Sequence, residues 1–188
     1  MERSSESSSL KTTKGPPENS ELVSFNSLSP NEAVNELLKC CGSKEWARRV
    51  TAEGPFESVA DLNAKADRIW WSLEQRDWLE AFHIHPKIGE KKAAAATAVD
   101  AQRWAADEQS GIRNSAQETM KALAELNREY EEKFGYIFIV CASGKSSEEM
   151  LAILLQRLGN NPDEELRLAA TEQAKITQLR LRKLIDNQ

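Results

Sequence analysis

The chain has 188 residues, with 25 Lys and Arg against 30 Asp and Glu, so its formal net charge is -5. Its length is typical of one domain, and 40% hydrophobic with 29% charged residues is close to the soluble globular average. The acidic balance argues against broad nucleic-acid binding, and no apolar run approaches the ~20 residues that a membrane span needs. The three cysteines, two of them adjacent, argue against a secreted disulfide scaffold.

The N-terminal residues are rich in Ser, Pro and charge and contain almost no large apolar side chains. Such a segment cannot bury enough apolar surface to offset its ordering entropy, so residues 1–24 are predicted to form a disordered tail. The tail lacks the apolar core of a signal peptide, and its acidic residues argue against a transit peptide. Residues 25–188 are predicted to form one compact helical domain.

Capping signals followed by helical periodicity predict most of this domain. The clearest signal is Ser29-Pro30 with Glu32, and the others begin at Ser58, Ser115, Ser146 and Asn161. The apolar pattern predicts one helix from about Ala60 to Phe82 and another from Pro162 to about Asp186. The predicted fold class is therefore all-α.

Residues 136–142 do not have a helical pattern. The run Tyr-Ile-Phe-Ile-Val-Cys-Ala is short, continuous, β-branched and aromatic, and it lies between Gly135 and Gly144. The pattern indicates a buried strand. Because a lone strand has no partner in a helical domain, a buried extended connector remains the alternative.

Two local motifs favour ordinary structural interpretations. Gly144-Lys145-Ser146 resembles the end of a P-loop, but Ile139 occupies the position where that motif needs Gly, so a glycine turn and a serine cap are favoured. His83 and His85 are the only histidines and lie two residues apart. A zinc site takes three or four protein ligands, so one solvent-facing and one buried histidine is favoured over a metal site.

Two polar features could carry function. Ala105, Glu108 and Gln109 share one face of a short helix that Gly111 is expected to close, where Glu108 would ordinarily be solvated. Arg180 has apolar residues four positions away on both sides of the last helix. It either extends its charged end to water or points into a pocket to hold an anion.

Several motifs in a fixed order resemble the 2-oxo-4-hydroxy-4-carboxy-5-ureidoimidazoline (OHCU) decarboxylase family over about residues 30 to 186. Each motif is weak alone, but the set is specific. The residues that carry the resemblance are His85-Pro86-Lys87-Ile88-Gly89-Glu90, Glu108-Gln109-Ser110-Gly111, Leu126-Asn127, Tyr130, Lys133-Phe134-Gly135 with the run to Ala142, Arg157-Leu158, Asn160, Glu165, Glu172, Lys175-Ile176 and Leu179-Arg180-Leu181. The Cys-Cys-Gly-Ser stretch at Cys40 is most similar to plant members, which are often fused to a transthyretin-like hydrolase.

The resemblance implies an all-α homodimer with a small-molecule substrate, no cofactor and no metal. It implies His85 as the proton donor, with Glu108 and Arg180 completing the catalytic set. It favours a non-helical, pocket-lining segment for residues 136–142. The implied substrate-binding positions are Pro86, Ala105, Glu108, Gln109, Phe138, Ile139, Val140, Cys141 and Ala142. Ala105 replaces a Ser found in many members, so one substrate hydrogen bond is lost or replaced.

The implied reaction is the cofactor-free decarboxylation of OHCU to (S)-allantoin in urate breakdown. Glu108 is expected to raise the pKa of the His85 imidazole, and Arg180 to hold a carboxylate or ring oxygen. A non-catalytic helical binding module and a decarboxylase or lyase for a related ureide remain alternatives. Relatives commonly work in peroxisomes, but Asp186-Asn187-Gln188 is not a Ser-Lys-Leu signal, so peroxisome and cytoplasm both remain open.

Overall fold

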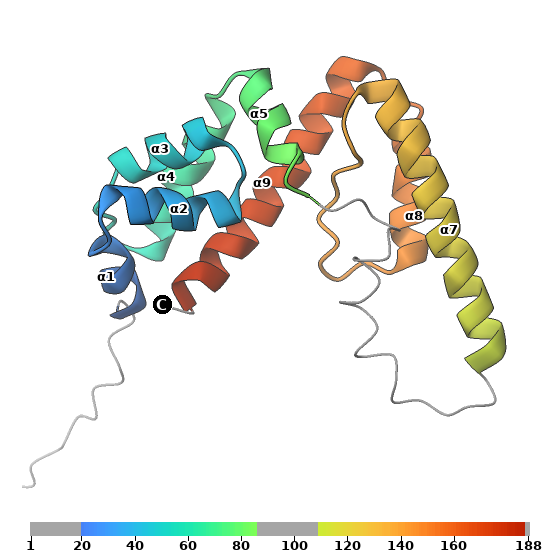
Figure 1. Cartoon of the computed structure of the whole chain (residues 1–188), viewed down its shortest axis with the longest axis horizontal. Helices are drawn as coiled ribbons and strands as arrows, with labels where there is room; N and C mark the ends of the chain where they lie inside the picture. The colour runs from blue at the N-terminus through green and yellow to red at the C-terminus, as the bar shows by residue number, and fades with distance from the viewer. Residues whose placement is uncertain (1–19, 86–108, 187–188) are drawn as a thin grey trace, which may run out of the picture.

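The computed structural model describes residues 20–85 and 109–186, with side chains for residues 22–85 and 117–186. The described residues form eight helices and no strand (Figure 1). The helices are α1 (Ser20–Asn26), α2 (Pro30–Cys40), α3 (Lys44–Ala52), α4 (Val59–Trp71), α5 (Gln75–Phe82), α7 (Gln109–Phe134), α8 (Ser147–Arg157) and α9 (Pro162–Asp186). The predicted all-α class is confirmed.

Helix α9 organises the molecule. It runs diagonally through it, with α1 to α5 on one side and the paired helices α7 and α8 on the other (Figure 1). Helices α1, α2, α4 and α5 all contact α9. The small side chains of Ala169 and Ala170 allow close approach there, and the Trp70 indole N–H donates to the carbonyl of Ala170 at 3.0 Å. No helix in residues 20–85 or 109–186 is long and apolar enough to cross a membrane.

The predicted helix starts are mostly confirmed by their capping bonds. Ser29 accepts the backbone N–H of Glu32 at 3.4 Å, and the Glu32 carboxylate accepts the N–H of Ser29 at 2.9 Å. The same reciprocal pair begins α8 at Ser146. The side chains of Ser58 and Asn161 each accept the backbone N–H of the residue three positions later, at 3.0 Å. The capping residues therefore predicted the starts of these helices correctly.

The single helix predicted from Ala60 to Phe82 is wrong, because the chain forms α4 and α5 with a break at residues 72–74. Ser72 donates its backbone N–H and its hydroxyl to the carbonyl of Ile69, at 3.0 and 2.7 Å. Glu74 then begins α5 by donating its N–H to the Asp77 carboxylate at 3.2 Å. These side chains compete with the helical ladder, which the apolar period alone did not reveal.

Two other boundaries differ from the sequence prediction. Helix α7 begins at Gln109 and passes through Gly111 and Ser115, so Gly111 closes no helix and Ser115 starts none. Helix α1 begins at Ser20 and buries Leu22 and Phe25, so the packed chain begins before residue 25. The rest of the predicted tail, residues 1–19, lies outside the described residues.

Candidate functional site

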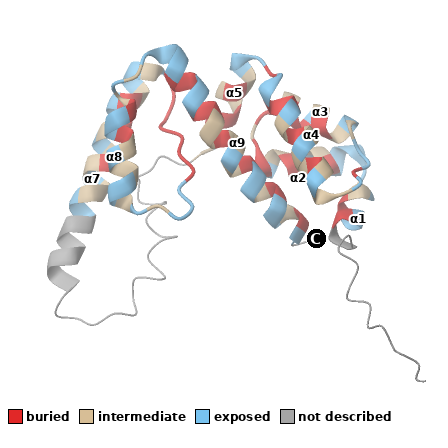
Figure 2. Cartoon of the chain, turned by 180° about the vertical axis from the view of Figure 1, so that it is seen from behind, coloured by how far each residue is buried: buried red, intermediate tan, exposed pale blue. Residues whose placement is uncertain are grey.

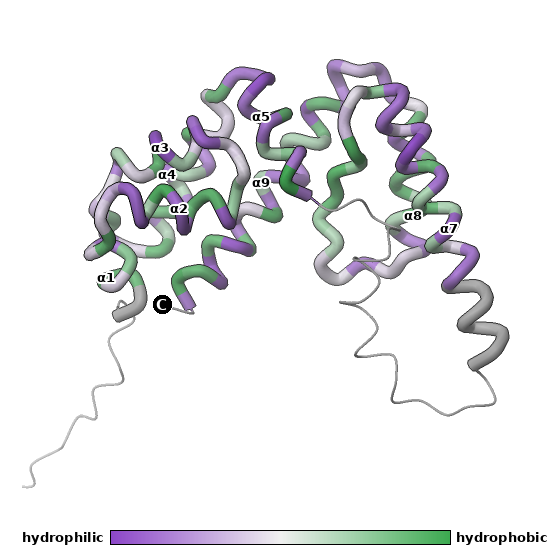
Figure 3. The backbone as a smooth tube through the Cα atoms, in the orientation of Figure 1, coloured by the Kyte–Doolittle hydropathy of each residue, from purple (hydrophilic) through white to green (hydrophobic). Residues whose placement is uncertain are grey.

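Residues 137–142, called the pocket segment below, connect α7 to α8 without forming helix or strand. The segment is buried for most of its length (Figure 2) and strongly apolar (Figure 3). The prediction of a strand is therefore wrong, and the alternative of a buried connector is confirmed. Buried backbone groups still need hydrogen-bond partners, so the absence of a neighbouring strand has to be compensated.

Side chains from the surrounding helices supply those partners. The Asn127 amide oxygen accepts the N–H of Phe138 at 3.0 Å, and Arg157 donates to the carbonyl of Ile139 at 2.7 Å. At Cys141, the Glu172 carboxylate accepts the N–H at 2.8 Å and the ammonium of a nearby lysine, Lys145, donates to the carbonyl at 2.6 Å. Four side chains from different parts of the chain therefore fix the segment.

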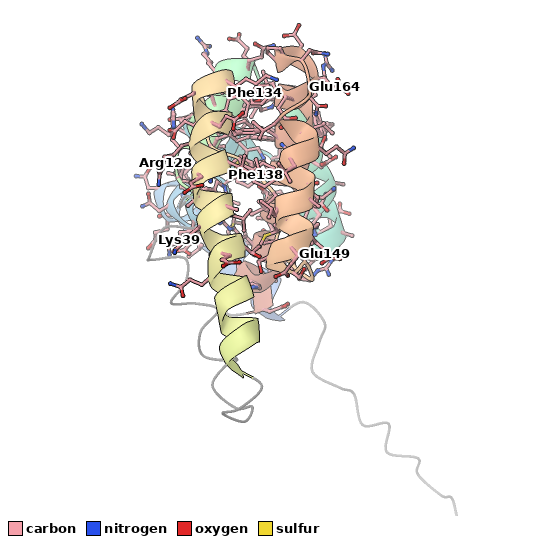
Figure 4. All side chains as sticks on the ribbon, turned by 90° about the vertical axis from the view of Figure 1, so that its right-hand side faces the viewer. Lys39, Arg128, Phe134, Phe138, Glu149 and Glu164 are labelled. Atoms are coloured by element: carbon pink, nitrogen blue, oxygen red, sulfur yellow. The ribbon has the colours of Figure 1, made fainter. Side chains whose placement is uncertain are left out.

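The Arg157 anchor is itself held by a buried cluster. Its guanidinium pairs with the Glu165 carboxylate at 2.5 Å, and the two side chains are 7% and 0% exposed. Tyr130 donates its hydroxyl to the same carboxylate, and Asn160 donates an amide N–H to it at 2.7 Å. The guanidinium also lies 4.8 Å from the ring centroid of Phe138, which sits between α7 and α8 (Figure 4).

The segment leaves the core through the predicted glycine turn. Gly144 has a φ of 76°, a left-handed conformation that favours glycine, and Lys145 donates its N–H to the carbonyl of Ala142 at 3.0 Å. Ser146 then caps α8. The turn-and-cap interpretation of Gly144-Lys145-Ser146 is confirmed.

A cavity of about 300 Å³ opens between the pocket segment, α9 and the end of α5. It brings together His85, Arg180 and all five predicted residues of the run Phe138 to Ala142. Sequence reasoning missed the other lining residues, of which Ile176 and Lys183 could have been found from their helical spacing with Arg180. The full lining is His85, Phe138, Ile139, Val140, Cys141, Ala142, Ser143, Ile176, Leu179, Arg180 and Lys183.

His85 is the histidine that lines this cavity. It is partly buried while His83 is exposed, as the sequence predicted. Burial lowers the pKa of His85 from 6.5, the positive charge of Arg180 lowers it further, and a hydrogen bond to Gln173 opposes both. Glu108, which was expected to raise this pKa, lies outside the described residues. The described neighbours therefore favour the neutral imidazole.

Arg180 lies in the cavity wall, which favours the interpretation in which it points into a pocket. One guanidinium nitrogen donates to the carbonyl of Cys40 at 3.3 Å. Cys40 is the last residue of α2, where the helix dipole places partial negative charge. The α2 terminus therefore holds the guanidinium beside the pocket, where it can bind an anion.

The remaining predicted positions cannot be placed in the site. Pro86, Ala105 and Glu108 lie outside the described residues, and Gln109 is described only as the first residue of α7. Their assigned roles stay predictions. Among the described residues, no group of three or more His, Cys, Asp or Glu side chains could hold a metal ion.

A second cavity of about 310 Å³ lies on the α8 side of Val140. Its charged side chains are already engaged: Lys175 pairs with Glu172 at 2.5 Å, and Lys145 and Arg157 hold the pocket segment. The first cavity instead combines an imidazole, a guanidinium and an apolar wall. That set can hold an anionic ligand and transfer a proton, so it is the candidate active site.

Comparison with known proteins agrees with this geometry. The OHCU decarboxylase family profile matches residues 26–182. The Arabidopsis thaliana uric acid degradation bifunctional protein TTL is 39% identical over 81% of this chain and 47% of its own length. An OHCU decarboxylase from Amia calva is 31% identical over 88% of this chain and 94% of its own. The chain thus spans about half of the bifunctional plant relative.

Solved structures show the same similarity. A crystal structure of an OHCU decarboxylase in the presence of (S)-allantoin is 38% identical, with a TM-score of 0.67 over 81% of this chain and 99% of the other. A second structure, of an (S)-allantoin synthase, is 20% identical with a TM-score of 0.62 over 88% of this chain, and it supports the fold alone.

Proposed function

This chain belongs to the OHCU decarboxylase family, and from that premise we propose that it converts OHCU to (S)-allantoin and carbon dioxide in urate breakdown. One observation carries the proposal: His85 and Arg180 meet the buried pocket segment in one cavity of about 300 Å³. The substrate is a small anion that needs a cation to hold it and an acid to protonate it. This cavity contains both groups.

The proposed chemistry follows from the substrate. Ring carbon 4 carries the carboxylate and a hydroxyl, and the adjacent carbon 5 carries the ureido group. When the bond to the carboxylate breaks, carbon dioxide leaves and the electron pair spreads over the unsaturated ring. A proton is then delivered to carbon 5 from one face, while the carbon 4 hydroxyl becomes a carbonyl and its proton passes to the ring nitrogen next to carbon 5, which received the electron pair. The product is a single enantiomer of allantoin. No group beyond an acid and a charge-stabilising cation is required.

His85 is proposed to deliver that proton, although burial and Arg180 lower its pKa in the free protein. The substrate carboxylate reverses this balance. Bound beside Arg180, it neutralises the guanidinium that opposes protonation and adds a negative charge near the imidazole. His85 is therefore expected to take up a proton as the substrate binds and to return it to carbon. Arg180 holds the carboxylate or a ring oxygen.

The other predicted positions complete the proposal. Glu108 is proposed to support the charged form of His85, and Gln109 to contact the substrate. Ala105 is proposed to line the site without the hydroxyl that many members have there. Pro86 and the run from Phe138 to Ala142 are proposed to form the remaining contacts, the latter through backbone groups that read the ureido and lactam edges of the ring.

The activity is tested by generating the substrate in the cuvette from urate with urate oxidase and the hydrolase, and by following (S)-allantoin by circular dichroism. We expect the chain to accelerate formation of the (S) enantiomer and His85→Ala to abolish this effect while remaining folded. The exposed His83→Ala is the matched control. An unchanged rate with racemic product would favour a non-catalytic binding module. Turnover of only another ureide would favour a different decarboxylase or lyase.

We also propose that the protein is a homodimer and works in the peroxisome or the cytoplasm, since both expectations follow from the family. Sedimentation equilibrium tests the first, and a monomer at micromolar concentration would contradict it. Cell fractionation with organelle markers tests the second.

A further inference from the structure

A row of buried polar side chains lies next to His85, and none of them lines the candidate active-site cavity. His85 Nε2 is 2.6 Å from the amide oxygen of Gln173, which is 0% exposed. The amide nitrogen of Gln173 donates to the hydroxyl oxygen of Thr177 at 3.1 Å, one turn further along α9. Neither Gln173 nor Thr177 is exposed by more than 6%.

The row has a chemical direction. The Thr177 hydroxyl oxygen accepts an amide N–H of Gln173, which fixes which end of the amide faces α9 and which end faces His85. With its NH₂ group directed to Thr177, Gln173 presents only its oxygen to the imidazole. That oxygen can accept but cannot donate.

We propose that Gln173 is a positioning residue that keeps a proton on Nε2 of His85, so that Nδ1 is the nitrogen that exchanges a proton with the substrate. Nε2 carries its proton in both the neutral and the charged imidazole, and only Nδ1 changes state. The row formed by Thr177 and Gln173 thus selects one neutral tautomer. The reactive role of Nδ1 rests on the proposed function, whereas the tautomer itself does not.

The other polar and charged groups around the imidazole do not impose this choice. Arg180 and Lys183 of α9 and Cys141 of the pocket segment line the same cavity. The Arg180 guanidinium disfavours the charged imidazole whichever nitrogen carries the proton. Among the described residues, Gln173 is the one side chain that hydrogen-bonds a ring nitrogen of His85.

The test is nuclear magnetic resonance of the ligand-free protein labelled with ¹⁵N-histidine. With only two histidines in the chain, the exposed His83 serves as an internal reference. We expect neutral His85 in the wild type to be the Nε2–H tautomer. An Nδ1–H tautomer in the wild type overturns the proposal without any variant. This measurement needs no activity, so its outcome is separate from that of the allantoin assay.

Two variants remove the row at different points. Gln173→Met removes the acceptor with little change of shape, and Thr177→Val removes the group that orients the amide. Each is expected to give a mixture of His85 tautomers, and Thr177→Ser to restore the single one. The exposed Gln178→Leu on the same helix is the control. An unchanged single tautomer in folded Gln173→Met overturns the proposal.

Activity supplies the second readout. In Gln173→Met, kcat for (S)-allantoin formation is expected to fall roughly tenfold or more, as part of the ~10²–10⁴ that a positioned acid contributes, while KM changes little. If kcat is unchanged and only KM rises, the positioning role is overturned, since Gln173 does not line the cavity.

Discussion

Removing the Glu165 carboxylate tests whether its buried ion pair with Arg157 holds the pocket segment in place beside the candidate active site. Glu165→Leu leaves the Arg157 guanidinium charged and nine-tenths buried. Within the described part of the chain, its remaining hydrogen-bond partners are two neutral oxygens, those of Ile139 and Tyr130. It also removes the acceptor of an amide N–H from Asn160. The substitution therefore creates an uncompensated charge in a position from which water is excluded.

The magnitude follows from this burial. Breaking a buried ion pair at one partner costs about 3–5 kcal/mol, because the remaining charge keeps its desolvation penalty. Small domains unfold with about 5–15 kcal/mol, so the variant should fold with a much lower urea midpoint. At a slope of ~1–3 kcal/mol per molar urea, the midpoint falls by roughly 1–5 M. Glu164→Leu, the exposed neighbour, is the matched control and should cost less than about 0.5 kcal/mol.

A double variant separates stability from function. In Arg157→Met with Glu165→Leu no charge is left buried, so the free energy of unfolding should recover by about 2 kcal/mol or more from the single variant. The carbonyl of Ile139 nevertheless still lacks its partner. We therefore expect the double variant to unfold at higher urea than Glu165→Leu, but to make (S)-allantoin more slowly than the wild type.

Urea unfolding followed by far-ultraviolet circular dichroism gives the stabilities, and the coupled urate assay gives the rates. A loss below about 1 kcal/mol for Glu165→Leu would show that the charge is not buried as described. Wild-type activity in the double variant would show that the Ile139 contact does not shape the site.

Three further predictions test separate parts of the site. Asn127→Leu should cost about 1–3 kcal/mol in urea unfolding, because a buried N–H of the pocket segment loses its acceptor; a cost near zero would contradict it. Gly42→Ala places a Cβ 2.5 Å from Cγ2 of Ile84, so Ile84, the residue before His85, must shift. We expect kcat to fall while the circular dichroism spectrum keeps its helical signal. An unchanged kcat would refute this. Because burial lowers the pKa of His85, the unfolded chain binds a proton at a higher pH than the folded chain does, so the free energy of unfolding should fall as pH drops below about 6.5. The variant His85→Asn should flatten this pH dependence, whereas the exposed control His83→Asn should not.

The sequence predicted those features that depend on neighbouring residues. Capping boxes such as Ser29 with Glu32 act over three residues, so their pattern is visible in the chain and most predicted helix starts are correct, whereas Ser115 starts no helix. The break at Ser72 was missed because its hydroxyl competes with the helix at a position where the apolar period continues. Placing His85 beside Arg180 depended on the family resemblance, since no periodicity links residues 95 positions apart in the sequence.

The pocket segment shows why a strand-like sequence pattern does not establish that a segment pairs with another strand. Its β-branched and aromatic residues were interpreted as a strand because that composition reports burial on a packed surface rather than a hydrogen-bonded neighbour. The actual partners, among them Asn127, Arg157 and Glu172, are spread along three helices. Each is an ordinary polar residue in an amphipathic pattern, so nothing local marks it as an anchor.

The same arrangement connects the fold to the proposed chemistry. If the pocket segment were a strand in a sheet, neighbouring strands would pair with its backbone N–H and C=O groups. Here side chains pair with only some of these backbone groups. Within the described residues, neither backbone group of Val140 has a protein partner, although Val140 is buried and lines the cavity. A ligand with alternating amide donors and acceptors, as in a ureido or lactam edge, can satisfy both. The side-chain partners that take the place of a neighbouring strand thus leave the backbone groups of Val140 available for the proposed substrate.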